Sequence, residues 1–146
     1  MTTTHVDFYV FQEAREEFPW QFICKLTEKI YKKNLPVWIY CASSNDAKKL
    51  DTLLWTYNDT SFVPHTLQSE MNDTPASIVI GSPPLSPPPQ VNTTVLLNIS
   101  ATIPSFYQNF SRIVEIVLPD TDSKTKSRET FREYQRQGYS IKTHPV

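Results

Sequence analysis

The hydrophobic positions of this chain switch between two periods in its N-terminal part. Short apolar runs at 6–11 and 37–41 have the length and the residue types of β-strands. In the segment between them, apolar side chains recur every four positions, at Phe22, Leu26 and Ile30. This spacing predicts an amphipathic helix over roughly 18–33, with Asn34 as the residue that stops it.

A second helical pattern follows the run at 37–41. Its apolar positions lie on one helical face, at Ala47, Leu50, Leu53 and Leu54. Ser44 and Asn45 are the candidate N-caps of this helix. The resulting order of strand, helix, strand and helix predicts a parallel sheet that is covered by helices.

The rest of the chain extends the same pattern. Apolar runs predict further strands at 62–63, 77–80, 94–99, 112–118 and 139–141, the last as an edge strand. A short helix is expected at 106–110, and a final helix at 120–137 ends before Gly138 as its C′ residue. The fold class is therefore α/β. We expect one three-layer domain over residues 1–146, with a mostly parallel central sheet flanked by helices in a Rossmann-like arrangement.

A proline-rich segment interrupts the strands at 82–89, where five of eight residues are proline. Such a stretch forms neither a helix nor a central strand. It is expected to be a stiff surface loop, although a polyproline ligand for another protein has the same composition.

Composition and charge argue against several classes of function. The chain has 14 basic and 15 acidic residues and a formal net charge of −1, which argues against a dedicated duplex-DNA or membrane-surface binder. Cys24 and Cys41 each lie in an apolar run, so both are expected to be buried, reduced thiols. No apolar run approaches the roughly 20 residues of a membrane span, and the first residues lack a signal-peptide pattern. A cytoplasmic protein is the simplest interpretation.

The sequence offers little support for an enzymatic function. Only two glycines occur, and neither the dinucleotide-binding nor the P-loop glycine pattern is present, so the expected sheet lacks a phosphate loop. His5, His65 and His144 have no metal-ligand spacing, and no nucleophile has an evident partner. The sequence predicts no catalytic residues, no metal site and no cofactor.

The final helix carries basic residues at every fourth position. Lys124 and Arg128 lie about 40° apart on a helical wheel, and Phe131 lies about 20° from Lys124 on the other side. The three side chains therefore share a face that suits a peptide with carboxylates and an apolar side chain. A solvated helix with charge pairs is the alternative, and the residues alone do not decide between the two.

A second candidate surface lies near the end of the helix at 47–54. Trp55 is followed by a polar stretch and then by Phe62 and Pro64. Large apolar residues of this kind usually pack in a core. Trp is also enriched in binding hot spots, so a partner-binding patch is the other interpretation.

Several of these residues carry a family resemblance. The stretch Lys49-Leu50-Asp51, Leu54-Trp55 and Ser61-Phe62-Val63-Pro64-His65 is similar to the chi subunit family of bacterial DNA polymerase III. Phe8-Tyr9 at the start and Arg128-Glu129, Tyr134 and Gly138-Tyr139 near the end also resemble that family. The similarity covers nearly the whole chain, whereas the proline-rich segment at 82–89 matches no motif of the family.

The resemblance implies a non-catalytic accessory subunit of the DNA polymerase III holoenzyme. Chi proteins bind the psi subunit, which tethers them to the clamp loader, and they bind the acidic C-terminal tail of single-stranded DNA-binding protein. Some members also engage a repair helicase through an overlapping patch. A bridge of this kind makes contact with DNA only indirectly, at the replisome in the cytoplasm.

The resemblance also implies positions for both binding sites. The tail-binding site corresponds to Val117, Lys124, Arg128 and Phe131, where the family often has tyrosine at the position of Phe131. The psi-binding patch corresponds to Trp55, Phe62 and Pro64. Two other classes remain open at this point: a nucleotide-dependent α/β enzyme and a protein that binds single-stranded DNA directly.

Overall fold

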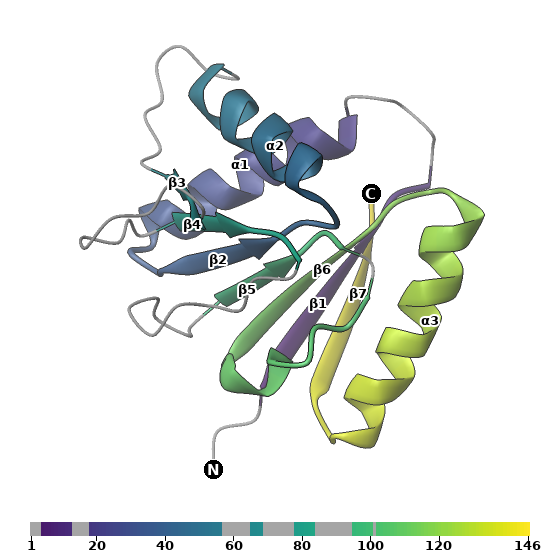
Figure 1. Cartoon of the computed structure of the whole chain (residues 1–146). Helices are drawn as coiled ribbons and strands as arrows, with labels where there is room; N and C mark the ends of the chain where they lie inside the picture. Colours follow the sequence, from purple (N-terminus) through teal and green to yellow (C-terminus); the bar gives the residue numbers. More distant parts are fainter. Residues whose placement is uncertain (1–3, 13–17, 57–64, 69–77, 84–94, 101) are drawn as a thin grey trace.

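The computed structural model describes residues 4–12, 18–56, 65–68, 78–83, 95–100 and 102–146. Seven strands form one sheet in the order β3-β4-β2-β5-β6-β1-β7, and every pairing among them is parallel (Figure 1). The strands are β1 (His5–Val10), β2 (Val37–Tyr40), β3 (Thr66–Leu67), β4 (Ile78–Gly81), β5 (Val95–Asn98), β6 (Arg112–Val117) and β7 (Ser140–Pro145). The helices are α1 (Phe18–Lys32), α2 (Ser44–Thr56), the 3₁₀ turn η2 (Tyr107–Asn109) and α3 (Thr121–Arg136).

The sheet separates two helical layers, as the sequence predicted. Helices α1 and α2 pack on one face, over an apolar cluster that includes Ile39 and Ile80, and α3 packs on the other face (Figure 1). On the α3 side, a second cluster includes Phe8, Trp38 and Tyr134. All four residues of β2 are buried because both faces of this strand are covered.

Two residues with positive φ end the helices, and both positions were predicted. Asn34 has φ 59° two residues after α1, and Gly138 has φ 77° two residues after α3. After α3, the Tyr139 amide donates to the Tyr134 carbonyl over 3.1 Å, and the Gly138 amide donates to the Gln135 carbonyl over 3.0 Å. These two bonds form a Schellman motif, and the stacked rings of Tyr134 and Tyr139 supply its hydrophobic contact.

Some local details differ from the sequence-based predictions. The N-cap of α2 is Ser43 rather than Ser44 or Asn45, because the Ser43 Oγ accepts a hydrogen bond from the Asp46 amide at 3.2 Å. The predicted strand at 62–63 lies outside the described residues, and the structure places the short strand β3 at Thr66–Leu67. Residues 84–89 of the proline-rich segment also lie outside the described residues.

Edge strand β7 is longer than expected and runs to Pro145. It pairs with β1 along its whole length, in a register that places Ser140 opposite His5 and Pro145 opposite Val10. Because β6 pairs with the other side of β1, helix α3 connects two strands that flank β1. This crossover lays α3 alongside β7 (Figure 1). Residues of both elements line the candidate site.

Both cysteines are buried thiols, as predicted. Cys24 and Cys41 are free and fully inaccessible, and burial raises the pKa of each thiol to about 12. Among the described helices, of which α3 is the longest with 16 residues, none is long and apolar enough to span a membrane.

Candidate functional site

Helix α3 presents three different faces along its length. Its buried face consists of small and polar residues with one large ring, namely Ser123, Ser127, Thr130 and Tyr134. On one flank, residues Lys126, Glu129 and Glu133 border the segment at 102–107. On the other flank, residues Lys124, Arg128 and Phe131 border the end of the sheet that carries β7.

A pocket of about 290 Å³ lies beside this second flank. Its walls come from α3 and from the adjacent strands β6, β1 and β7, and its lining residues are Phe8, Val10, Gln12, Val117, Lys124, Ser127, Arg128, Phe131 and Thr143. The four residues that the resemblance assigned to tail binding, Val117, Lys124, Arg128 and Phe131, therefore line one pocket. They come from two elements, since Val117 ends β6 and the others lie on α3.

The floor of the pocket is apolar and its rim is basic. Val117 and Phe8 are buried, and the Phe131 ring is half-buried with its centroid 5.4 Å from that of Phe8. Lys124 is half-buried and Arg128 is exposed. Apolar surface beneath two cations is the combination that holds a carboxylate and an adjacent ring together.

Two carboxylates of α3 and the carboxylate that caps it are engaged elsewhere. Asp122 pairs with Lys126 at 3.1 Å, and Glu133 pairs with Arg136 at 2.7 Å. Asp120 caps the helix by accepting from the Ser123 amide at 2.8 Å, and this hydrogen bond lowers the pKa of its carboxyl. Within the part of the chain that the structure describes, no carboxylate lies within ion-pair distance of Lys124 or Arg128.

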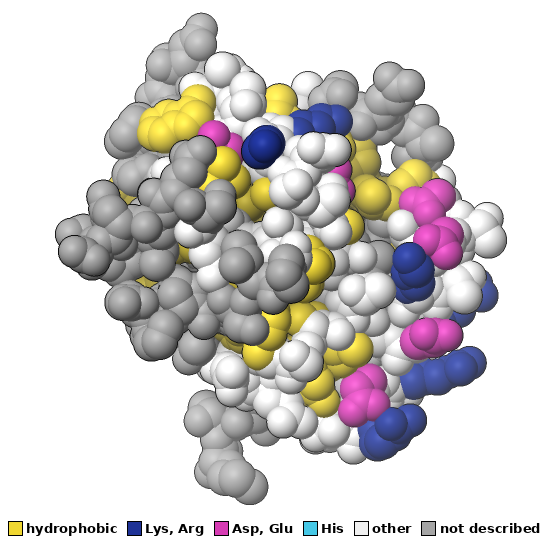
Figure 2. All heavy atoms as spheres, in the orientation of Figure 1, with side chains coloured by type: hydrophobic (Ala, Val, Ile, Leu, Met, Phe, Trp, Pro, Cys, Tyr) yellow, Lys and Arg dark blue, Asp and Glu magenta, His cyan; other side chains and the backbone are white. Residues whose placement is uncertain are grey.

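Figure 2 shows that basic and acidic side chains alternate over the outer surface of α3. The i,i+4 pair of Asp122 and Lys126 and the i,i+3 pair of Glu133 and Arg136 account for part of this pattern. The alternative interpretation of the helix, as a solvated surface with charge pairs, therefore describes one flank. The flank with Lys124 and Arg128 forms the rim of the pocket.

The sequence did not identify five of the pocket residues: Phe8, Val10, Gln12, Ser127 and Thr143. Phe8 and Val10 are alternate residues of β1, so they lie on the same face of the sheet, and this alternation is the signal that could have placed them. Thr143 was missed because the predicted edge strand stopped at 141. Gln12 follows β1 and gave no sequence signal.

Beneath the second half of α3 lies a buried polar network. The Tyr134 hydroxyl donates to the carboxylate of Glu115, which is 2% exposed. The Asn98 side-chain amide donates to both Glu115 oxygens, at 3.1 and 3.0 Å. Burial raises the pKa of Glu115 to about 7, although the hydrogen bonds from Tyr134 and Asn98 oppose this shift. The network ties α3 to β5 and β6 and so fixes the helix that carries the cations.

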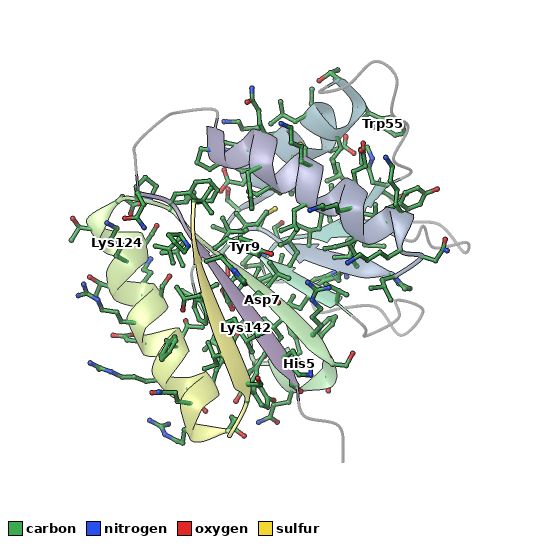
Figure 3. All side chains as sticks on the ribbon, turned by 180° about the vertical axis from the view of Figure 1, so that it is seen from behind. His5, Asp7, Tyr9, Trp55, Lys124 and Lys142 are labelled. Atoms are coloured by element: carbon green, nitrogen blue, oxygen red, sulfur yellow. The ribbon has the colours of Figure 1, made fainter. Side chains whose placement is uncertain are left out.

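The second candidate patch is described only in part. Trp55 lies at the end of α2 and is 49% exposed (labelled in Figure 3). Its ring centroid lies 4.2 Å from that of His65. His65 itself is buried, with Nε2 3.0 Å from the Asp51 carbonyl oxygen, so it has a structural role. Phe62 and Pro64 lie outside the described residues.

The described residues contain no group of three or more His, Cys, Asp or Glu side chains that could hold a metal ion. A cluster of mixed charge on the sheet surface is centred on Asp7. Its carboxylate lies 2.9 Å from His144 Nε2 and 3.7 Å from the Arg112 guanidinium. These contacts join three neighbouring strands (β6, β1 and β7) on the face opposite α3.

Comparison with known proteins gives consistent results over nearly the whole chain. The family model described as DNA polymerase III chi subunit, HolC, matches residues 3–142. The DNA polymerase III subunit chi of Pseudomonas aeruginosa is 33% identical over 141 residues, which cover 97% of this chain and 96% of that protein. The subunit chi of Haemophilus influenzae is 30% identical and covers 95% of each chain. The subunit chi of Escherichia coli is 25% identical, over 84% of this chain and 82% of that one.

A solved structure supports the fold alone. The crystal structure of T4 UvsW matches with a TM-score of 0.67 and 10% identity, over 98% of this chain and 41% of the UvsW chain. That likeness agrees with the Rossmann-like layering of helices on a parallel sheet. The family match over residues 3–142, together with relatives that are 30% identical or more over almost their full length, establishes that the chain belongs to the DNA polymerase III chi subunit family.

Proposed function

We propose that this chain is a non-catalytic accessory subunit of the DNA polymerase III holoenzyme that bridges the clamp loader to single-stranded DNA-binding protein. In this proposal the psi subunit binds at the patch around Trp55, Phe62 and Pro64. The acidic C-terminal tail of single-stranded DNA-binding protein binds in the pocket beside α3. Family membership supports the role in replication, and the chemistry of the pocket supports the choice of partner.

The observation that carries the proposal is the pocket's combination of two cations and an apolar floor. Lys124 and Arg128 lie on its rim without an ion-pair partner among the described residues, above Val117 and Phe131. A peptide that ends in acidic residues and a C-terminal Phe has the complementary groups. Its terminal carboxylate would be held by the Arg128 fork, and its ring would lie on the apolar floor.

The size of the pocket fits a side chain better than a cofactor. At about 290 Å³ it lies just below the range for ligand pockets, which begins at about 300 Å³. Phe8, Val10 and Val117 present carbon to the ligand, and no glycine lies among the lining residues to let a phosphate approach the backbone. Recognition of a peptide terminus is therefore favoured over binding of a nucleotide.

Binding at such a site is expected to be weak and sensitive to salt. The cations lie at the rim, where ion pairs contribute little and are screened within about 10 Å at 0.1 M salt. A dissociation constant in the micromolar range, about −8 kcal/mol, is typical of such a contact. Many tails displayed on one coated template would compensate through a high effective concentration.

The test is a titration of a fluorescein-labelled peptide that ends in acidic residues and a C-terminal Phe, at two salt concentrations. Arg128→Ala should weaken binding at least about tenfold, which corresponds to about 1.4 kcal/mol. Arg136→Ala is the matched control, because Arg136 lies on the same helix, is exposed and pairs with Glu133. Binding that survives Arg128→Ala unchanged would show that the peptide does not occupy this pocket.

The psi-binding patch needs its own test. Phe62→Ala should abolish co-purification with the psi subunit while leaving the affinity for the tail peptide unchanged. Loss of both activities would indicate misfolding instead. A repair helicase that shares this patch would compete with psi in the same assay.

Two other functions make different predictions. A nucleotide-dependent enzyme would be stabilised by its nucleotide, by about 2.7 kcal/mol at 100 times the dissociation constant, so a thermal-shift screen would reveal it. A protein that binds single-stranded DNA directly would bind a bare oligonucleotide, whereas the proposed bridge contacts DNA only through its partner. We place this bridge at the cytoplasmic replisome, with no membrane contact and no cofactor.

A further inference from the structure

Strand β7 is the last strand of the sheet, and among the described residues one of its edges has no neighbouring strand. Its other edge pairs with β1: the Ser140 amide donates to the Thr4 carbonyl at 3.1 Å and the Val146 amide to the Val10 carbonyl at 2.8 Å. In a parallel ladder, alternate residues direct their backbone groups to the same side. The even-numbered residues of β7 thus face β1, and Ile141 and Thr143 direct their amides and carbonyls outward.

This outer edge is accessible in the part of the chain that the structure describes. Ser140, Lys142, Thr143 and Pro145 are exposed, and Ile141 is half-buried against the α3 side of the sheet. An edge with free amides and carbonyls is a template for one more strand. Peptides that bind in this way gain affinity from main-chain hydrogen bonds and specificity from pockets for alternate side chains.

The edge and the tail-binding pocket meet at Thr143. Thr143 lines the pocket together with Lys124 and Arg128, and its own backbone groups point to the free edge. α3 lies alongside β7, with its first turn, which carries Lys124, near the end of β7 (Figure 1). A peptide whose last residue occupies the pocket therefore leaves it along the β7 edge.

We propose that the upstream part of the bound peptide pairs with the free edge of β7 as an eighth strand, parallel to β7. This inference rests on the proposed function, because it extends the path of the same acidic tail. The direction follows from the geometry. The C-terminus of the peptide lies in the pocket at the Thr143 end, so its preceding residues run back toward Ser140 and continue the all-parallel order of the sheet.

The charges around the edge are those that an acidic strand needs. On the α3 side of the sheet, Lys124 and Arg128 line the pocket together with Thr143. Lys142 is exposed on the opposite face of the sheet, as Figure 3 shows for its position on β7. Alternate side chains of an added strand point to opposite faces. Successive acidic residues of the tail would therefore meet Arg128 on one face and Lys142 on the other.

A second copy of the chain is the competing occupant of this edge, and the residues of β7 disfavour it. Edge strands are commonly protected from self-pairing by lysine and proline, and β7 carries both at Lys142 and Pro145. Antiparallel pairing of two β7 strands would also bring the Lys142 side chains of both copies close together. An acidic partner turns the same lysine into an attractive contact.

The direct test is hydrogen exchange of individual backbone amides, monitored by NMR. It is measured on the full chain with and without the peptide that ends in acidic residues and Phe. We expect the amides of Ile141 and Thr143 to exchange at least about tenfold more slowly in the complex, as hydrogen-bonded amides do. The amides of Lys142 and His144, which already face β1, should change by less than about twofold. Equal exchange at Ile141 and Thr143 in the free and bound protein would overturn the inference.

A second test uses the backbone of the peptide and of the strand. Peptide amides can be methylated in two alternating registers, one of which would face β7. Only methylation in that register should weaken binding, by about tenfold. Thr143→Pro removes an outward amide that β1 does not use, and it should weaken binding by a similar factor. No difference between the two methylation registers would reject strand addition.

These outcomes separate the inference from the proposed function. If the unmodified peptide fails to bind the wild-type protein, the proposed function itself is wrong. If the peptide binds and depends on Arg128 but not on the amide of Thr143, tail binding stands and strand addition is rejected. If light scattering shows a dimer in solution and the amides of Ile141 and Thr143 are already protected in it without peptide, strand addition by the peptide is also rejected.

Discussion

The Tyr134 hydroxyl on α3 donates a hydrogen bond to the buried carboxylate of Glu115 on β6. Asn98 on β5 donates to the same carboxylate, so the Glu115 side chain accepts hydrogen bonds from two other elements. No buried side-chain nitrogen or oxygen among the described residues lacks a partner. The α3 helix is therefore held by a satisfied polar network as well as by apolar contacts.

This network predicts a dependence of stability on pH. The pKa of Glu115 rises from 4.5 to about 7 on folding because burial disfavours the charged carboxylate. The folded state then binds more protons than the unfolded state between these values, so stability falls as pH rises from about 4.5 to about 7. The contribution is on the order of 3 kcal/mol. Urea denaturation at a series of pH values would measure this slope.

Glu115→Gln is the variant that isolates this effect. The amide keeps an oxygen that can accept from Tyr134, but it does not titrate. The variant should lose most of the fall in stability between pH 4.5 and 7, whatever its absolute stability. A slope as steep as that of the wild type would assign the pH dependence to another group.

Gly81 predicts a second effect on stability. A Cβ atom at this position would lie 2.6 Å from the Trp38 ring and 2.5 Å from the Gln68 side-chain oxygen. That oxygen accepts a hydrogen bond from the Trp38 indole at 3.1 Å, so the ring has little freedom to move away. Gly81→Ala should therefore cost about 2 kcal/mol through overpacking, measured by chemical denaturation.

Gly138→Ala is the informative comparison for Gly81→Ala. Gly138 has open space around the position of a Cβ atom, but its φ is 77°. Its cost should be about 1 kcal/mol, from backbone conformation alone. Similar denaturation midpoints for wild type and Gly81→Ala would mean that Trp38 is free to repack.

The flank of α3 that lines the pocket could be predicted from the sequence because helical geometry is regular. The 100° rotation per residue placed Lys124, Arg128 and Phe131 on one side, and all three line the pocket. The helix ends at Asn34 and Gly138 were also predictable, since few residue types adopt positive φ. These features depend on local chemistry, which a single sequence carries.

The contribution of β7 could not be predicted in the same way. The residues that extend this strand, from Lys142 to Pro145, are mostly polar and exposed, and their pairing with β1 is set by tertiary contacts. The capping serine of α2 was misplaced by one residue because three consecutive polar residues, Ser43 to Asn45, are all good N-caps. The choice among such residues depends on where the preceding strand ends.

Phe131 should tolerate a hydroxyl but not the loss of its ring. The half-buried ring packs against Phe8, and one side of it faces the pocket. Phe131→Tyr should therefore leave the affinity for the tail peptide within about twofold, and Phe131→Ala should weaken it by about tenfold. Fluorescence anisotropy with the labelled peptide measures both. An unchanged affinity for Phe131→Ala would exclude the ring from the site.

The two thiols should be inert in the folded protein. Cys24 and Cys41 are fully inaccessible, and burial raises the pKa of each to about 12, so almost no thiolate is present at neutral pH. A thiol reagent such as dithionitrobenzoate should label neither residue in native buffer and both in denaturant. Rapid labelling of one thiol under native conditions would reveal local opening of α1 or of the end of β2.

Substitutions of Trp55 distinguish its contribution to stability from its contribution to psi binding. About half of its surface is exposed, so Trp55→Ala should lose less than the roughly 3–5 kcal/mol of a fully buried tryptophan, and about 1–2 kcal/mol is expected. Its other face contacts the His65 ring, which Trp55→Phe would retain in part. If the patch binds psi, Trp55→Ala should lose psi in a pull-down while still binding the tail peptide, and Trp55→Phe should lose less. Full retention of psi by a folded Trp55→Ala variant would remove Trp55 from the interface and leave it as a support for His65.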